Sequence, residues 1–304
     1  MRMDRTTGSS LIGGYIYAII VITAMLGVFV FLGRYTLGRA GMMLVLGVSV
    51  LSLVHAARFA HARLLSQAVA VRYESAPFLV DAVVRLSREA EIVKVPRLFV
   101  LPSPTPNALT VGGRKDPSIV ITSGLLQRLS GRELEGVLAH EIAHIANDDL
   151  RILTVAESVR QSTLALSQMG QILILIGFPF LFMAGEPFPW GFVGMAVLAP
   201  FISLALHFSL MRNREFAADA TAARITGDAR GLASALRSIE SPRSGIFNVL
   251  MPAQKKESGA LLRSHPATEQ RIQRLLEIDD ETFGESTGRS AWPFRHGDGM
   301  TRVV

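Results

Sequence analysis

The chain has 304 residues, of which 49% are hydrophobic and only 18% are charged. This balance is unusual for a water-soluble protein and favours a membrane protein. The chain has no cysteine, which excludes disulfides and thiolate metal sites, and the basic residues behind its net charge of +6 are scattered, which argues against nucleic-acid binding.

Two apolar segments near the N-terminus, 12–32 and about 40–57, are long enough to cross a bilayer core of roughly 30 Å as helices. Two further candidates lie at about 166–184 and 191–210. The later pair contains glutamines and a proline, so a hydrophobic hairpin that packs on the rest of the protein or lies in the membrane interface is the alternative to two spans. The sequence therefore predicts about four transmembrane or membrane-associated helices.

Orientation follows from the bias of Lys and Arg in the short connecting loops. Arginines precede the first segment and follow the second and the fourth, whereas the loop between the third and fourth has none. This bias predicts that both termini and the central domain are cytoplasmic. The turn after the first segment, with Arg34 and Arg39, is an exception.

Between the second and third apolar segments the pattern is that of a soluble domain. Apolar residues recur at helical spacing over 75–91. Residues 97–101 and 118–122 read as short strands of a small sheet, separated by a Pro-rich and Gly-rich stretch that contains Asn107.

A helix is predicted at 130–147, with Ser130 as its N-cap and Glu133 at the capping-box position. Later helices are predicted at 212–226, 231–239 and 268–278. A loop at 241–264 and a tail after 280, both rich in Gly and Ser, complete the chain.

The strongest local motif is His140-Glu141-Ile142-Ala143-His144, inside the helix predicted at 130–147. Four residues make slightly more than one helical turn, so both imidazoles project from one face and can bind one metal ion, with Glu141 near its open position. The alternative is a pair of core histidines bonded to the backbone. The uncharged residues around the motif favour the metal site.

A catalytic zinc site needs a third protein ligand. Glu215 and Asp219 are four residues apart on a predicted helix, so one carboxylate could bind the metal while the other accepts a ring N–H of a histidine. Spacing alone does not distinguish this from a solvated acidic pair neutralised by Arg212 and Arg214. His265 opens the last helix, where N-terminal capping is an alternative role.

These motifs resemble those of the HtpX-type membrane metalloproteases, which are relatives of the CAAX prenyl proteases. The resemblance covers most of the chain and rests on motifs in the same order. They are Pro106-Asn107-Ala108, His140 to His144 with Asn147 and Asp149, Arg214-Glu215 with Asp219, and His265-Pro266 with Thr268, Glu269 and Arg271.

The resemblance implies a mainly α fold with a small β-sheet and a zincin-like (gluzincin) catalytic domain in the membrane. It implies one zinc ion (Zn2+) per chain, bound by His140, His144 and Glu215. Glu141 would be the general base and proton shuttle, and Asp219 would be the partner of a zinc-binding histidine, with His140 favoured.

Further roles follow from the same resemblance. His265 would stabilise the oxyanion or hold the substrate, supported by Arg271, and Asn107 with Ala108 would bind the substrate backbone. The strand at 118–122 would be the edge to which an extended substrate adds. The chain departs from the family pattern after Ala108, where an aromatic residue is usual, and this concerns substrate fit rather than the metal.

The implied organisation is a transmembrane hairpin (1–60), two parts of a zinc protease domain (61–165 and 211–280), a second hydrophobic hairpin (166–210) and a disordered tail (281–304). The implied enzyme is a multi-pass endopeptidase of the bacterial inner membrane. It would cleave membrane or misfolded proteins at a cytoplasmic site in quality control and the stress response. The alternatives are a CAAX-type enzyme acting on prenylated tails, and a membrane scaffold that keeps the metal helix only for stability.

Overall fold

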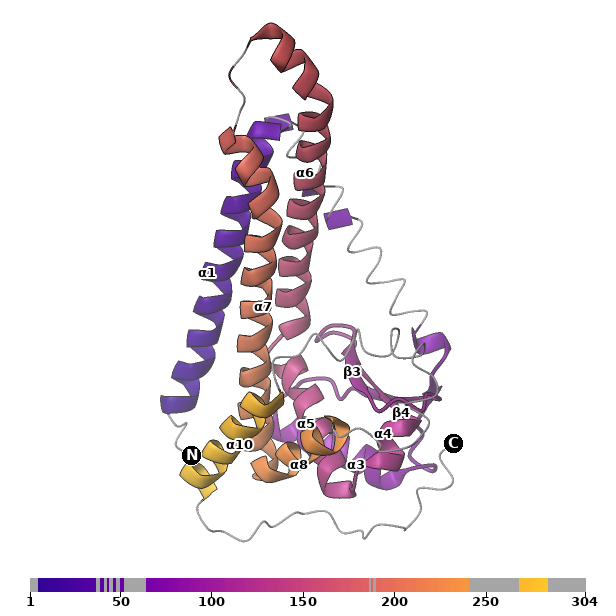
Figure 1. The fold of residues 1–304 in the computed structure, drawn as a ribbon. Coiled ribbons are helices and arrows are strands. Elements are labelled where there is room, and N and C mark those ends of the chain that lie inside the picture. Colours follow the sequence, from indigo (N-terminus) through magenta and orange to yellow (C-terminus); the bar gives the residue numbers. More distant parts are fainter. Residues whose placement is uncertain are drawn as a thin grey trace, which may run out of the picture. The chain divides into compact units, whose positions relative to one another are not determined.

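The structure is a computed structural model that describes residues 5–36, 39–40, 43, 46–47, 50–51, 64–185, 187, 190–240 and 268–283. The described part is mainly helical with one small mixed sheet, which confirms the predicted fold class at this level (Figure 1). The chain divides into two compact units. One consists of 1–59 with 151–213, and the other of 60–150 with 214–304.

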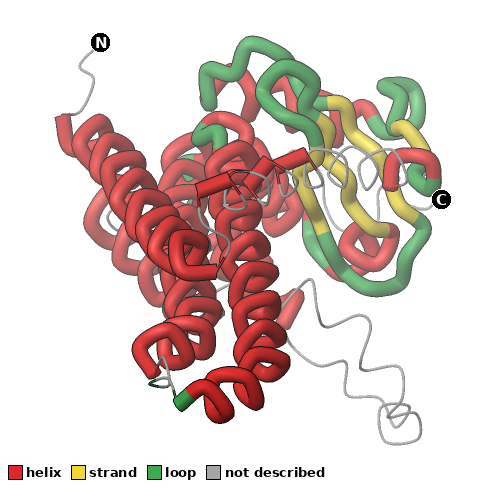
Figure 2. The backbone as a smooth tube through the Cα atoms, turned by 90° about the horizontal axis from the view of Figure 1, so that it is seen from above, coloured by secondary structure: helices red, strands yellow, loops and turns green. Residues whose placement is uncertain are grey.

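Within its described residues, the first unit contains three helices that are long and apolar enough to cross a membrane. They are α1 (Arg5–Thr36), α6 (Asp149–Ala184) and α7 (Trp190–Thr226), and they lie side by side in Figures 1 and 2. The third and fourth apolar segments of the sequence are thus helical. Most of the second, at 40–57, lies outside the described residues. In α7 the segments predicted separately at 191–210 and 212–226 form one helix.

The three helices pack through a narrow seam and expose large apolar side chains elsewhere. Met25 and Phe29 of α1 are buried together with Ala156 and Ala199. By contrast, Phe182 is 79% exposed, as expected for a surface that contacts lipid.

Polar groups within the apolar helices are satisfied across this seam. The Ser167 hydroxyl of α6 donates to the Ala196 carbonyl of α7. The amide of Gln171 donates to the same carbonyl over 3.1 Å. Such bonds between small and polar residues hold helices together in lipid, so Gln171 is compatible with a membrane span.

The second unit is built on a four-stranded sheet in the order β1-β2-β4-β3 (Figure 2). The strands are β1 (Val69–Ala70), β2 (Arg97–Leu101), β3 (Ala108–Val111) and β4 (Ser118–Thr122). β2 and β4 are parallel, whereas β3 runs antiparallel to β4. The sequence predicted the bounds of β2 and β4 and missed β1 and β3.

The expectation that 118–122 forms a sheet edge is wrong, because β4 lies between β2 and β3. All five residues of β4 are buried. A strand covered on both faces reads as a continuous apolar run, and such runs belong in the interior of a sheet. Among the described residues, the edge on this side of the sheet is β3.

Among the described residues, five labelled helices accompany the sheet in this unit, besides the end of α7. They are α3 (Pro77–Glu89), α4 (Ser123–Arg128), α5 (Gly131–Ala146), α8 (Ala229–Glu240) and α10 (Thr268–Phe283). The core joins Leu79 and Leu86 of α3 with Ile121, Leu138 and Leu275.

The helix α5, which carries the histidine motif, is held at both its beginning and its middle. The predicted capping box is confirmed, since the Ser130 side chain accepts from the Glu133 amide and the Glu133 carboxylate accepts from the Ser130 amide over 2.8 Å. At Gly136 a Cβ atom would lie 2.9 Å from the Leu232 backbone of α8. Only glycine allows α5 and α8 to approach this closely.

Candidate metal centre

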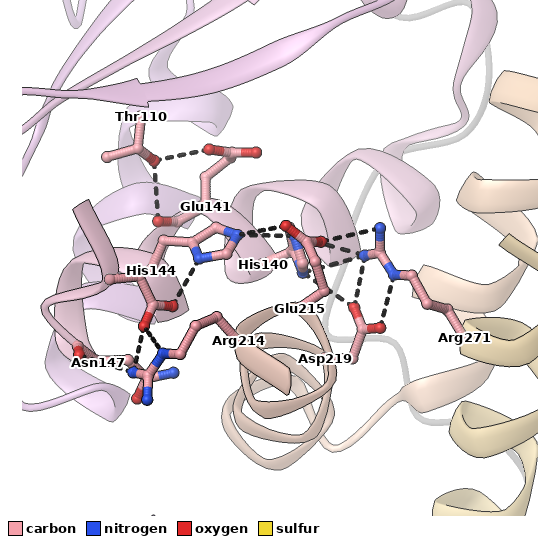
Figure 3. A network of polar contacts seen from close by, with 10 residues as sticks. Thr110, His140, Glu141, His144, Asn147, Arg214, Glu215, Asp219 and Arg271 are labelled. Carbon is pink, nitrogen blue, oxygen red and sulfur yellow. Dashed lines mark hydrogen bonds and ion pairs between the residues drawn. The ribbon is translucent and has the colours of Figure 1, made fainter. Parts of the chain in front are cut away.

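His140 and His144 stand one turn apart on α5 and turn their Nε2 atoms toward each other. The two Nε2 atoms are 3.1 Å apart, and the rings are nearly perpendicular (Figure 3). His140 is buried and His144 is partly buried. Two imidazole nitrogens this close need a proton or a metal ion between them, because their lone pairs repel each other.

Glu215 of α7 faces this pair. Its Oε2 atom lies 3.4 Å from His140 Nε2, and its Oε1 atom lies 3.7 Å from His144 Nε2. Zinc–nitrogen bonds of about 2.0–2.1 Å at a tetrahedral angle place two ligand nitrogens roughly 3.3 Å apart. The three side chains therefore have the donor atoms and the spacing to hold one metal ion.

Each imidazole uses its other nitrogen to bind a carboxylate. His140 Nδ1 lies 3.0 Å from Asp219, and His144 Nδ1 lies 2.7 Å from Asp149. A carboxylate at Nδ1 fixes the ring and its tautomer, which leaves Nε2 to bind the metal. The sequence singled out Asp149 as part of a motif but gave it no role.

Asp149 is in turn held by Arg214, the residue before Glu215. The Arg214 guanidinium is almost completely buried, donates to the Asp149 carboxylate and also donates to the Asn147 carbonyl over 3.0 Å. Between α5 and α6 the chain turns through Asp148 with a φ of 53°. This turn and the buried ion pair between Arg214 and Asp149 hold Asp149 next to His144.

Arg271 of α10 binds the carboxylates of Asp219 and Glu215. Its guanidinium makes two hydrogen bonds of 2.8 and 2.7 Å to Asp219 and lies 3.1 Å from Glu215. One buried cation thus offsets part of the charge of two buried carboxylates. The support that Arg271 was expected to give His265 concerns a residue outside the described ranges.

These charges control the protonation of His140. Burial and the Arg271 charge lower the pKa of His140, but hydrogen bonds to Asp219 and Glu215 outweigh them and raise it to about 10. In the chain without a metal ion His140 is therefore protonated at neutral pH. A metal ion must displace this proton, so metal affinity falls as the pH is lowered.

The Glu141 side chain lies on the side of α5 that faces the sheet. It is buried, and its Oε2 atom accepts a hydrogen bond of 2.7 Å from the Thr110 hydroxyl of β3 (Figure 3). Sequence reasoning missed Thr110, because nothing in the sequence shows that β3 runs beside α5.

The predicted site residues are therefore placed as follows. The structure brings together His140, Glu141, His144, Glu215, Asp219 and Arg271. Ala108 is the first residue of β3, and Asn107 immediately precedes it, with its backbone bonded to Thr122. His265 lies outside the described residues.

Two imidazoles and a carboxylate around one point, a glutamate beside them and long apolar helices define a membrane metalloprotease. Comparison with known proteins identifies the family: residues 74–279 match Peptidase family M48, and the chain belongs to this family.

Relatives named Protease HtpX homolog match over most of the chain. The protein from Acaryochloris marina (strain MBIC 11017) is 36% identical over 80% of this chain and 87% of its own. The protein from Persephonella marina (strain DSM 14350 / EX-H1) is 31% identical over 86% of this chain and 96% of its own. The crystal structure of S. mikatae Ste24p aligns with 88% of this chain and 66% of that longer chain, at 18% identity and a TM-score of 0.44.

Proposed function

We propose that this metalloprotease is a zinc endopeptidase that cleaves membrane or misfolded proteins at a cytoplasm-facing site, in membrane protein quality control. The observation that carries the proposal is the convergence of His140, His144 and Glu215 on one point. The donor set supports zinc, because imidazole and carboxylate ligands that leave one position to water are typical of catalytic zinc.

Zinc bound there would supply a Lewis acid that lowers the pKa of water and polarises a carbonyl group. The side chains of the protein transfer the proton and position the ligands. Glu141 takes the proton of the attacking water and returns it to the amine that leaves. Asp219 and Asp149 keep the two imidazoles in place, and Arg271 offsets the charge of Glu215.

The substrate would bind as an extended peptide along β3, in place of the strand at 118–122. The support is that β3 forms an edge among the described residues and carries Thr110, whose side chain contacts Glu141. A peptide that adds to such an edge is held by backbone hydrogen bonds, and pockets for its alternate side chains give specificity. Ala108 begins this strand directly after Asn107, and the resemblance assigns His265 to stabilising the oxyanion or holding the substrate.

The test of the zinc endopeptidase is metal content together with hydrolysis of casein by the detergent-purified full chain. We expect about one zinc ion per chain. Hydrolysis should stop with a chelator and return when zinc is added back. Cleavage that persists after zinc has been removed would contradict the proposal.

The orientation of the chain in the membrane can be tested separately. Because the chain has no cysteine, an introduced cysteine is its single reactive thiol. Lys115→Cys places one thiol in the exposed loop between β3 and β4, and Pro187→Cys places one between α6 and α7. A membrane-impermeant maleimide should label Pro187→Cys in intact spheroplasts and Lys115→Cys only after lysis, since the loop between α6 and α7 carries no Lys or Arg. The reverse pattern would contradict a cytoplasm-facing site.

A further inference from the structure

Thr110 is the described residue that connects the strand β3 to the glutamate of the histidine motif. Its hydroxyl lies 2.7 Å from Glu141 Oε2 and 3.0 Å from the Glu141 backbone carbonyl oxygen (Figure 3). Among the described residues, no other side chain donates a hydrogen bond to this carboxylate. The hydroxyl has one proton for two acceptors, and the charged carboxylate is the stronger of them.

This hydrogen bond limits the rotation of the carboxylate. The terminal torsion of a glutamate side chain is broad, so without a partner the two oxygens exchange places easily. With Oε2 held by Thr110, Oε1 is the oxygen that exchanges a proton. A catalytic group held in one orientation reacts faster than one that must first find it.

The position of the hydroxyl depends on the register of β3. Thr110 pairs with Ile119 of β4, and this register turns its side chain toward α5. Successive side chains of a strand point to opposite faces, so a shift by one residue would remove the hydroxyl from Glu141. The strand that would bind the peptide therefore also aligns the group that acts on the peptide.

We propose that Thr110 is a positioning residue, which orients the Glu141 carboxylate from the substrate-binding strand through its hydroxyl group. The proposal rests on the proposed function, in which Glu141 is the general base. It adds to that function a residue that acts on turnover through Glu141, without contact with the metal or with the reacting atoms.

The test compares Thr110→Val, which keeps the shape and loses the hydroxyl, with Thr110→Ser, which keeps the hydroxyl and loses the methyl group. We expect Thr110→Val to lower kcat about tenfold, the size expected for a hydrogen bond to a charged group, with KM changed less than about twofold. Thr110→Ser should retain most of the wild-type kcat. Thr110→Ala should behave like Thr110→Val, and zinc content should be unchanged throughout.

The matched control is Ser87→Ala, which removes a buried hydroxyl bonded to the Val83 carbonyl of α3, outside the metal centre. It should keep the wild-type kcat. A purely structural role of Thr110 would raise KM and make Thr110→Ser as slow as Thr110→Val, and that result would overturn the proposal. So would a wild-type kcat in Thr110→Val.

Failure of the proposed function and failure of the role of Thr110 give different experimental results. If the proposed function is wrong, wild-type hydrolysis is insensitive to zinc removal or to Glu141→Gln. If only the role of Thr110 is wrong, wild-type hydrolysis responds to both, and the Thr110 variants alone depart from expectation.

Discussion

We expect Glu141→Gln to lower the rate of casein hydrolysis by about 10²–10⁴-fold, the range that general acid–base catalysis contributes. The carboxamide has nearly the same shape as the carboxylate and still offers an oxygen to the Thr110 hydroxyl, but it cannot take a proton from water. Since Glu141 is bonded to Thr110 and is not one of the three grouped donors, zinc content should stay at about one ion per chain. Both quantities are measured on the same purified sample.

Glu135→Gln is the control for this variant. Glu135 is a buried glutamate on the same helix, α5, and pairs with Arg85 of α3. It should keep the wild-type rate and the wild-type zinc content. Full activity in zinc-loaded Glu141→Gln would remove Glu141 from the role of base, and loss of zinc in that variant would mean that Glu141 supports the metal instead.

The second large effect is expected from Glu215→Ala, which should lose zinc and, with it, all hydrolysis. Two imidazoles alone hold zinc much less tightly than two imidazoles and a carboxylate. Among the described residues, Glu215 is the carboxylate that groups with both imidazoles of α5. Asp219→Asn should weaken zinc binding by only about 10–100-fold, because Asp219 acts through His140. Metal content after gel filtration and a competition titration with a chelator measure both variants.

Asp116→Ala is the matched control for these carboxylates. Asp116 lies on the surface of the same unit and pairs with Lys94 and Arg97. Its removal should leave zinc content unchanged. If Glu215→Ala retained zinc at the wild-type level, Glu215 would not be a ligand, and the third ligand would have to be sought elsewhere.

Local sequence patterns predicted most of the helices and two of the strands. The helix α5 could be located because its signals are local: a capping residue at Ser130, its reciprocal partner at Glu133 and apolar residues at helical spacing. In the same way β2 and β4 are short apolar runs between turn residues. β3 was missed because it has only four residues between a Pro-rich and a Gly-rich stretch, and its partner strand defines it more than its own sequence does.

The site shows the same limit. Residues of one motif on one helix, such as His140 and His144, can be placed relative to each other by counting turns. The partners Asp149 and Thr110 depend on a left-handed residue at Asp148 and on the register of β3 against β4. These are non-local features, and no spacing in the sequence encodes them. The wrong edge strand has a different cause: the continuous apolar run of β4 is typical of an interior strand, and the edge was assigned from the resemblance instead.

The helix α7 contains both a candidate membrane span and Glu215. On the proposed ligand set, a ribosome-bound chain that has emerged only as far as α6 carries both histidines and Glu141 but lacks the third ligand. We expect a nascent chain of this length to bind zinc weakly and to be inactive. On this ligand set, we expect the metal site to be complete only after translation has passed the apolar part of α7.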